Sequence, residues 1–211
     1  MTMADILLSI ISCIISGLIS WGLSAWYYKK ANNDAVYSEI VLPLQLTDDC
    51  NLYRKCYEVQ ASFAYNRILS IKGKRILDNI SNKAMLIHLG KHRYMASGLI
   101  EELYKELEIP QYEEVEYLDG HEGKEPRHQN GYQLEVELAE LLEQGETEEN
   151  EEQIKKILID YGKEYMTDIE YTLLEGIINN MSIFKAIKRS ESYNSFLKNK
   201  EEIQSSIISL K

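Results

Sequence analysis

The chain has 211 residues, a formal net charge of −11, three prolines and three cysteines. This length suffices for one domain with a real core or two small ones, and the scarcity of proline and glycine argues against a turn-rich β fold. Three cysteines without metal-ligand spacing fit a reducing compartment and argue against a disulfide scaffold. We therefore expect an all-α protein.

An uncharged apolar run opens the chain: residues 6–26 read ILLSIISCIISGLISWGLSAW. As a helix this run is about 30 Å long, which matches the hydrocarbon core of a bilayer. The aromatic cluster at residues 26–28 and then Lys29 and Lys30 form an interfacial belt with a positive flank. We expect residues 1–30 to be a transmembrane anchor in the cell membrane, with the N-terminus outside and residues 31–211 in the cytoplasm. A cleaved signal peptide is the alternative, but residues 1–5 lack the basic residues that it needs.

Small residues recur along this anchor at helical spacing. They are Ser9, Ser12, Cys13, Ser16, Gly17, Ser20 and Ser24. Small side chains on one face let two transmembrane helices approach closely, so we predict self-association through this small face. Pairing with a different membrane protein and a plain anchor are the alternatives. In the plain anchor each serine hydroxyl bonds back to the carbonyl four residues earlier.

The segment 31–110 predicts three further helices. The anchor helix is expected to continue toward Val41 and to end before Pro43, since the residue before a proline disfavours helix. Thr47 and the two aspartates after it are expected to cap a helix that runs to about residue 71. Apolar stripes then predict helices over 74–89 and 94–107.

The remaining residues predict an acidic loop and a second helical segment. Residues 111–131 contain three glycines and a proline, and are expected to be a loop in which Tyr112, Val115 and Tyr117 form at most a stray strand. In 132–211 we expect a short helix over 134–142, a long helical stripe over 154–187 with glycine or asparagine bends, and a last helix over 196–210. The segments 31–110 and 132–211 are expected to pack as one bundle-like cytosolic domain.

The negative charge is concentrated in the middle of the chain. Residues 109–160 carry sixteen acidic and four basic side chains, while the segments on either side are balanced. Anionic lipid and nucleic acid would be repelled here, which makes nucleic acid or a nucleotide the less favoured class of partner. The segment is either a solvated surface or a docking surface for a protein partner.

Basic residues between the expected helices form a candidate patch for an anionic ligand. They are Lys72, Lys74, Arg75, Lys83, Lys91 and Arg93. The same residues would also be ordinary solvated side chains near helix ends. Phosphate-binding glycine motifs are missing, so the patch has no further support.

The sequence holds no recognisable catalytic arrangement. It has no GxSxG motif, and His88 and His92 have helical metal-ligand spacing but no carboxylate between them. His121 and His128 fall in the acidic loop and suit only adventitious metal binding. We expect no enzyme activity, no cofactor and no metal.

Two functions remain. The layout of one span and a cytoplasmic helical domain resembles that of small bacterial membrane-acting defence effectors, although no residue motif carries this resemblance. It implies a cytosolic sensing domain coupled to a membrane-acting, even membrane-perturbing, output. The alternative is a non-enzymatic tethered adaptor that recruits a cytosolic partner.

Overall fold

The computed structural model describes the backbone of residues 3–116 and 122–210 and the side chains of 10–115 and 122–210. The fold is all-α, as the sequence predicted, and the described residues also contain a small two-stranded sheet that was not expected. It divides into two units, one of residues 1–82 with 203–211 and the other of residues 83–202. This division differs from the expected segments 31–110 and 132–211. Tyr117 and His121 lie outside the described residues.

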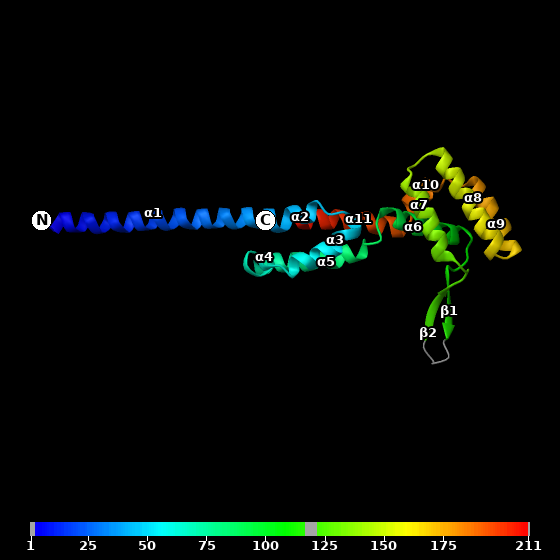
Figure 1. The fold of residues 1–211 in the computed structure, drawn as a ribbon, viewed down its shortest axis with the longest axis horizontal. Coiled ribbons are helices and arrows are strands. Elements are labelled where there is room, and N and C mark those ends of the chain that lie inside the picture. The colour runs from blue at the N-terminus through cyan, green and yellow to red at the C-terminus, as the bar shows by residue number, and fades with distance from the viewer. Residues whose placement is uncertain (1–2, 117–121, 211) are drawn as a thin grey trace. The chain divides into compact units, whose positions relative to one another are not determined.

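The first unit begins with one continuous helical rod (Figure 1). It consists of α1 (Met3–Val36), a π-helical turn (Tyr37–Val41) and α2 (Leu42–Gln45). The expected end before Pro43 is therefore wrong. In the π-helical turn the Leu42 N–H donates to the Tyr37 carbonyl, five residues back, and Pro43 then occupies the first turn of α2, where its missing N–H costs least.

Three further helices and the end of α11 (Glu191–Ile208) complete this unit. They are α3 (Asp49–Gln60), α4 (Phe63–Arg67) and α5 (Ile71–Leu86), of which residues 71–82 belong to the unit. The expected single helix to residue 71 is broken because Ser62 caps a new helix, its hydroxyl accepting from the Tyr65 N–H. Buried apolar side chains from all these elements form the core: Val36, Ile40, Val41, Leu44, Leu52, Cys56, Val59, Ala64, Leu77, Ile80, Ile203 and Ile207.

The second unit consists of helices around a core of its own. They are α6 (Lys91–Glu106), α7 (Gly131–Glu143), α8 (Glu148–Tyr165), α9 (Asp168–Asn180), α10 (Ile183–Arg189) and α11 (Glu191–Ile208) up to residue 202. Helix α6 packs against α7 and α10, and α8 packs against α9 (Figure 1). The largest fully buried side chains are Ile87, Leu99, Leu138, Ile154, Leu158, Leu174, Ile178 and Phe196.

The expected stripe over 154–187 forms three helices instead of one. Thr167 makes the main break with a capping box: its hydroxyl accepts from the Glu170 N–H, and the Glu170 carboxylate accepts from the Thr167 N–H. Each hydrogen bond gives a partner to a backbone N–H group that would otherwise lack one at the start of a helix. A second break at Ser182 separates α9 from α10.

An antiparallel hairpin occupies most of the segment expected as a loop. Strands β1 (Tyr112–Glu116) and β2 (Glu122–Pro126) pair in the register Tyr112 to Pro126 and Glu116 to Glu122. In Figure 1 the hairpin projects away from the helices of its own unit. Its side chains are mostly exposed, so the hydrophobic pattern that marks a half-buried strand is weak here.

Candidate functional site

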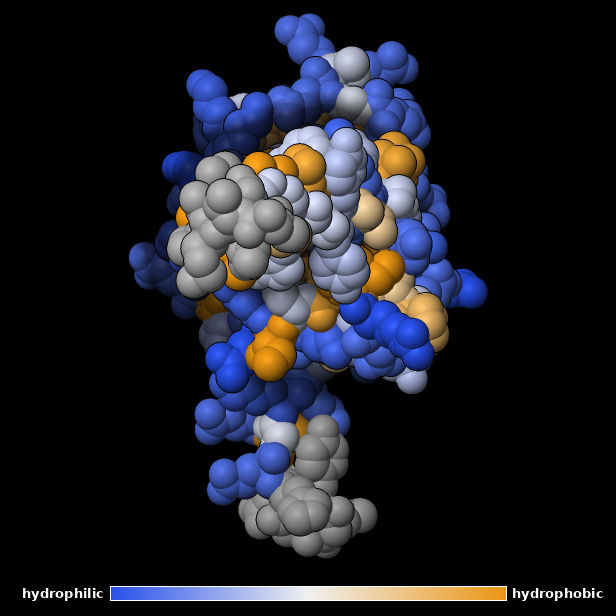
Figure 2. Space-filling model, turned by 90° about the vertical axis from the view of Figure 1, so that its left-hand side faces the viewer, coloured by the Kyte–Doolittle hydropathy of each residue, from blue (hydrophilic) through white to orange (hydrophobic). Residues whose placement is uncertain are grey.

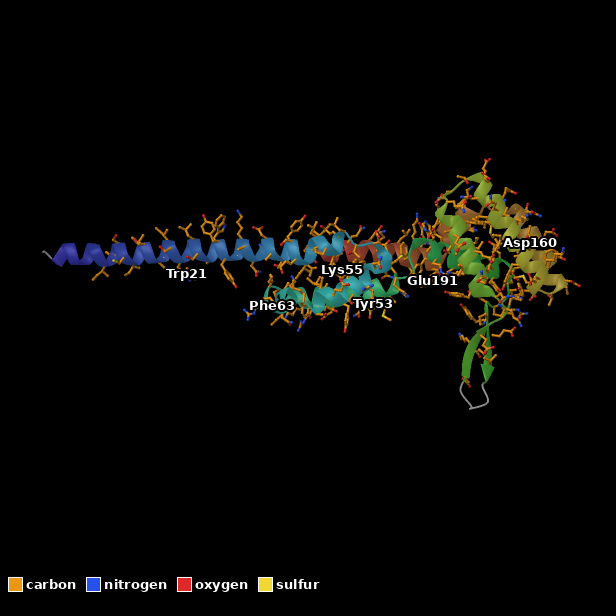
Figure 3. The ribbon with its side chains drawn as sticks, in the orientation of Figure 1. Trp21, Tyr53, Lys55, Phe63, Asp160 and Glu191 are labelled. Atoms are coloured by element: carbon orange, nitrogen blue, oxygen red, sulfur yellow. The ribbon has the colours of Figure 1, made fainter. Side chains whose placement is uncertain are left out.

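The first candidate site is the apolar part of α1, which no other described residue covers. It is the one described helix that is long and apolar enough to cross a membrane, and none of its apolar window is buried. Ile11 and Leu18 are 49% and 63% exposed, and Trp21 projects from the helix (Figure 3). Burying such a side chain completely is worth about 1.5–3 kcal/mol, so this surface favours an apolar environment.

The seven small residues predicted to mediate self-association share one face of α1, whereas Gly22 and Ala25 lie on the opposite face. At about 100° per residue, all seven predicted positions fall within an arc of roughly 140°, with Leu23 as the one bulky residue between Ser12 and Ser24 inside it. The opposite arc holds Ile11, Ile14, Ile15 and Leu18. In the end-on view of Figure 2, orange and pale residues occupy much of the central face. Ser9 lies on α1, but its side chain is outside the described ones.

The six residues of the predicted anionic-ligand patch fall into both units. Lys72, Lys74 and Arg75 lie on the first turns of α5 in the first unit, whereas Lys83, Lys91 and Arg93 belong to the second. Lys83 forms an ion pair with Glu202. Arg93 lies 3.4 Å from a Glu135 carboxylate oxygen and stacks on the Tyr132 ring. Three of the six therefore lie on one stretch of α5, and two of the others are engaged within the second unit.

The second unit contains a buried polar cluster that was not predicted from the sequence. Arg127 donates from Nε and Nη2 to Glu170 Oε1, at 3.2 and 3.0 Å, and from Nη1 to Glu113 at 2.7 Å. His128 Nε2 lies 3.3 Å from the other Glu170 oxygen, and its Nδ1 lies 2.8 Å from the Tyr104 hydroxyl. A carboxylate can only accept, so in the neutral ring Nε2 donates to Glu170 and Nδ1 accepts from Tyr104.

Glu170 holds this cluster together as an anion. Its burial raises the pKa, but hydrogen bonds from Thr167, His128 and Arg127 outweigh that effect and lower the pKa to about 2. The carboxylate therefore connects the hairpin, through Arg127, to the N-terminus of α9. The sequence signal was the Thr-x-x-Glu spacing of a capping box; nothing in it indicated the pairing with residues some forty positions earlier.

A cavity of about 260 Å³ lies beside this cluster, between α6, α7, α8 and the base of the hairpin. Its lining includes Tyr104, His128, Tyr132, Glu135 and Tyr161. Burial raises the pKa of both Tyr104 and Tyr161, so their hydroxyls stay protonated near neutral pH. Burial also raises the pKa of Glu135, while Arg93 opposes the shift. This lining suits hydrogen bonding to a small polar ligand.

A larger and more open hollow, about 780 Å³, lies along α9 and α10. It is lined by apolar side chains such as Leu173 and Ile177 and by the basic Lys185 and Arg189. Arg189 is already engaged by carboxylates of α6, at 3.8 Å from both Glu102 and Glu106. This hollow therefore offers an apolar surface more than a charged one.

His88 and His92 have separate partners. His88 Nδ1 lies 2.6 Å from the Met85 carbonyl oxygen, and His92 lies 3.6 Å from Glu143. Among the described residues no group of three or more histidine, cysteine or acidic side chains could hold a metal ion. In comparisons with known proteins, the chain matches no family, no curated protein and no solved structure.

Proposed function

We propose that the protein is a single-pass membrane protein that self-associates through the small face of α1 and couples a cytosolic helical sensing domain to a membrane-acting output. The observation that carries the proposal is an apolar helix that the rest of the chain leaves uncovered. In a bilayer its exposed isoleucines and leucines face lipid, and its backbone polar groups are satisfied within the helix.

The flanks of the span orient it. Lys29 and Lys30 directly follow Trp26 and two tyrosines, and Lys30 Nζ lies 5.5 Å from the Trp26 ring centroid. Tryptophan and tyrosine prefer the headgroup level, and lysines close to a span favour the cytoplasmic side. The proposal therefore places the N-terminus outside and both folded parts in the cytoplasm of the cell.

The small face supports self-association. Lipid tails are as apolar as leucine, so helices associate in a bilayer by close packing and polar contacts, and small side chains permit both. An added Cβ at Gly17 would meet no atom within 4 Å, so packing within this chain does not require glycine there. Close contact with another helix would require a residue this small.

The cytosolic part supports a sensing role through the cavity beside Tyr104 and His128. At about 260 Å³ it lies just below the usual range of ligand pockets, which fits a small ligand. The output resembles that of membrane-acting defence effectors in layout alone. The alternative, a tethered adaptor with its partner on 109–160, has less support because several carboxylates there already have partners within the chain, such as Glu113, Glu135 and Glu146.

Oxidative crosslinking in membranes tests the self-association. Cys13 lies on the small face, Cys50 is exposed, and Cys56 is buried in the core, where burial raises its pKa to about 12. The test protein carries Cys50→Ser, which leaves Cys13 as the accessible thiol. We expect a Cys13-linked dimer from membranes that resist carbonate extraction.

A matched variant moves the thiol to the opposite face. Cys13→Ser with Leu18→Cys should give little dimer, because Leu18 lies roughly 140° away around the helix. Equal crosslinking from both faces would show random collision in the membrane and favour the adaptor. Release of the protein by carbonate would contradict the membrane span itself.

A further inference from the structure

The turn from α4 into α5 lies beside α1 at the point where the span leaves the bilayer. Asn32 Nδ2 of α1 donates to the Ile68 carbonyl at 3.4 Å, and both residues belong to the first unit. In Figure 1, α4 lies alongside the rod that α1 begins. The α4–α5 turn is therefore fixed at the level of residue 32.

Helix geometry places this level at the outer edge of the lipid headgroups. At about 1.5 Å per residue, Asn32 lies roughly 3 Å beyond Lys30 and roughly 9 Å beyond Trp26. The headgroup layer extends about 5–8 Å beyond each side of the hydrocarbon core. A span that ends at Trp26 thus brings the α4–α5 turn to the outer edge of the headgroups.

The side chains of this turn have the composition of a membrane-binding surface. Between Glu58 and Asp78 the chain has no acidic residue. It has four basic residues and two exposed apolar ones there, which we call the basic tip: Phe63, Arg67, Ile71, Lys72, Lys74 and Arg75. Phe63 and Ile71 are 70% and 77% exposed, among the most exposed large apolar residues of the first unit. Figure 3 shows Phe63 well separated along the unit from Tyr53 and Lys55 of α3.

The four basic groups are available for an external anion. Within the described part of the chain none of them forms an ion pair, in contrast to Arg54 and Lys55, which both pair with Glu58. The Arg67 guanidinium lies 4.8 Å from the Phe63 ring centroid, and Lys74 Nζ lies 4.9 Å from that of Tyr65. These cation–π contacts place apolar rings beside the charges, as at other membrane interfaces.

We propose that the basic tip docks on anionic lipid headgroups of the leaflet through which α1 leaves the membrane. This inference rests on the proposed membrane span and adds a second contact between the first unit and the bilayer. Phe63 and Ile71 enter the headgroup layer, and the four basic groups bind lipid phosphates. Docking would restrict the tilt and rotation of α1 and so orient its small face.

Depth-dependent fluorescence in nanodiscs tests the proposal with the full chain. The probe is a nitrobenzoxadiazole label on Asn66→Cys, in the Cys13→Ser and Cys50→Ser background, with Asn51→Cys on α3 as the matched label. Both asparagines are exposed. In discs with phosphatidylglycerol, we expect headgroup nitroxides to quench the label at 66 and not the label at 51.

Charge variants then distinguish specific docking of the basic tip from unspecific attraction of basic residues to anionic lipid. Replacing Arg67, Lys72, Lys74 and Arg75 with glutamine should lower the bound-to-free ratio of the tip about fivefold for each charge removed. The matched variant, Arg54→Gln with Lys55→Gln, removes basic groups from α3 and should leave the quenching unchanged. Discs of pure phosphatidylcholine should resemble the glutamine variant.

The same sample shows whether the span or the tip has failed. With Trp26→Tyr, Trp21 is the one tryptophan of the chain, and its quenching by lipids brominated in their tails reports insertion of α1. Inserted α1 with an unquenched label at 66, or equal quenching in neutral and anionic discs, would overturn the tip proposal alone. The emission of the label at 66 could instead shift to the blue in neutral discs, and only in discs that hold two copies of the chain. That result would mean that Phe63 and Ile71 pack against a second copy and not against lipid. Absence of Trp21 quenching would overturn both proposals.

Discussion

At the residue scale, Glu170 has the most connections of any buried charge described in the structure. Its carboxylate caps α9 and accepts hydrogen bonds from the Arg127 guanidinium and from His128 Nε2, although Glu170 is only 8% exposed. A buried carboxylate is tolerated only when its hydrogen bonds replace those of water. Its five donor groups come from two places in the chain, residues 127–128 and Thr167, so the same side chain both begins a helix and joins distant segments.

Replacing this carboxylate should destabilise the second unit. Glu170→Gln keeps the shape but removes the charge that Arg127 and His128 require, and we expect a loss of roughly 2–3 kcal/mol of unfolding free energy. Urea unfolding of the full chain in detergent measures it. Glu175→Gln, on an exposed position of the same helix, is the control and should change stability by less than about 0.5 kcal/mol.

The pH dependence of stability provides a second readout of Glu170. Its pKa is lowered from 4.5 to about 2 in the folded state, so the folded state favours the anion. The stabilisation is therefore complete above about pH 4.5 and is lost as the pH falls toward 2. The Glu170→Gln variant should show a flatter loss of stability over this range. Parallel curves for the variant and the parent chain would contradict the assignment.

At the element scale, the all-α class and the helical positions followed from apolar periodicity, whereas the breaks between helices did not. Ser62, Thr167 and Ser182 each end a stripe that continues in the sequence, because the apolar spacing persists across a cap. The hairpin was missed for a related reason: its residues are mostly exposed and lack a buried face. The contacts of His128 and Glu170 depend on that hairpin, so periodicity alone could not reveal them.

Two glycines should respond in opposite ways to the same substitution. A Cβ on Gly98 of α6 would lie 2.1 Å from Ser190 Oγ and 2.9 Å from its Cβ, and Ser190 is fully buried and hydrogen-bonded to Ile187. Gly98→Ala should therefore cost about 1–3 kcal/mol. Gly176 of α9 has open space, so Gly176→Ala should stabilise by up to about 1 kcal/mol.

Thermal unfolding of both alanine variants, with circular dichroism as the signal, gives the comparison directly. The two substitutions have the same intrinsic helix propensity, so the difference between them isolates the close contact between α6 and α10. A stabilising Gly98→Ala would mean that the two helices separate at little cost, contrary to the packing described.

At the scale of the whole molecule, the proposed activity requires that α1 do more than anchor the chain. The sequence predicted the span and its small face, because both depend on local spacing. The basic tip could not be recognised in full, since its position relative to the membrane depends on the contact of Asn32 with Ile68. An anchor needs only apolar side chains, whereas an assembling span also needs its small face, and this difference can be tested.

Bulk on the small face should abolish assembly without preventing insertion. Ser16→Leu with Ser20→Leu keeps the span apolar but blocks close approach, whereas Ser→Ala at the same positions should do little, because interhelical polar contacts contribute only about 0.6 kcal/mol each. Gly22→Leu with Ala25→Leu adds comparable bulk on the opposite face and is the matched control. Added bulk at Gly22 meets no atom within 4 Å of its Cβ position.

We expect the Ser16 and Ser20 leucine variant alone to lose the Cys13 crosslink and any growth inhibition on overexpression. Equal crosslinking and equal growth inhibition in both leucine variants, each correctly inserted, would leave α1 as a tether and favour the adaptor.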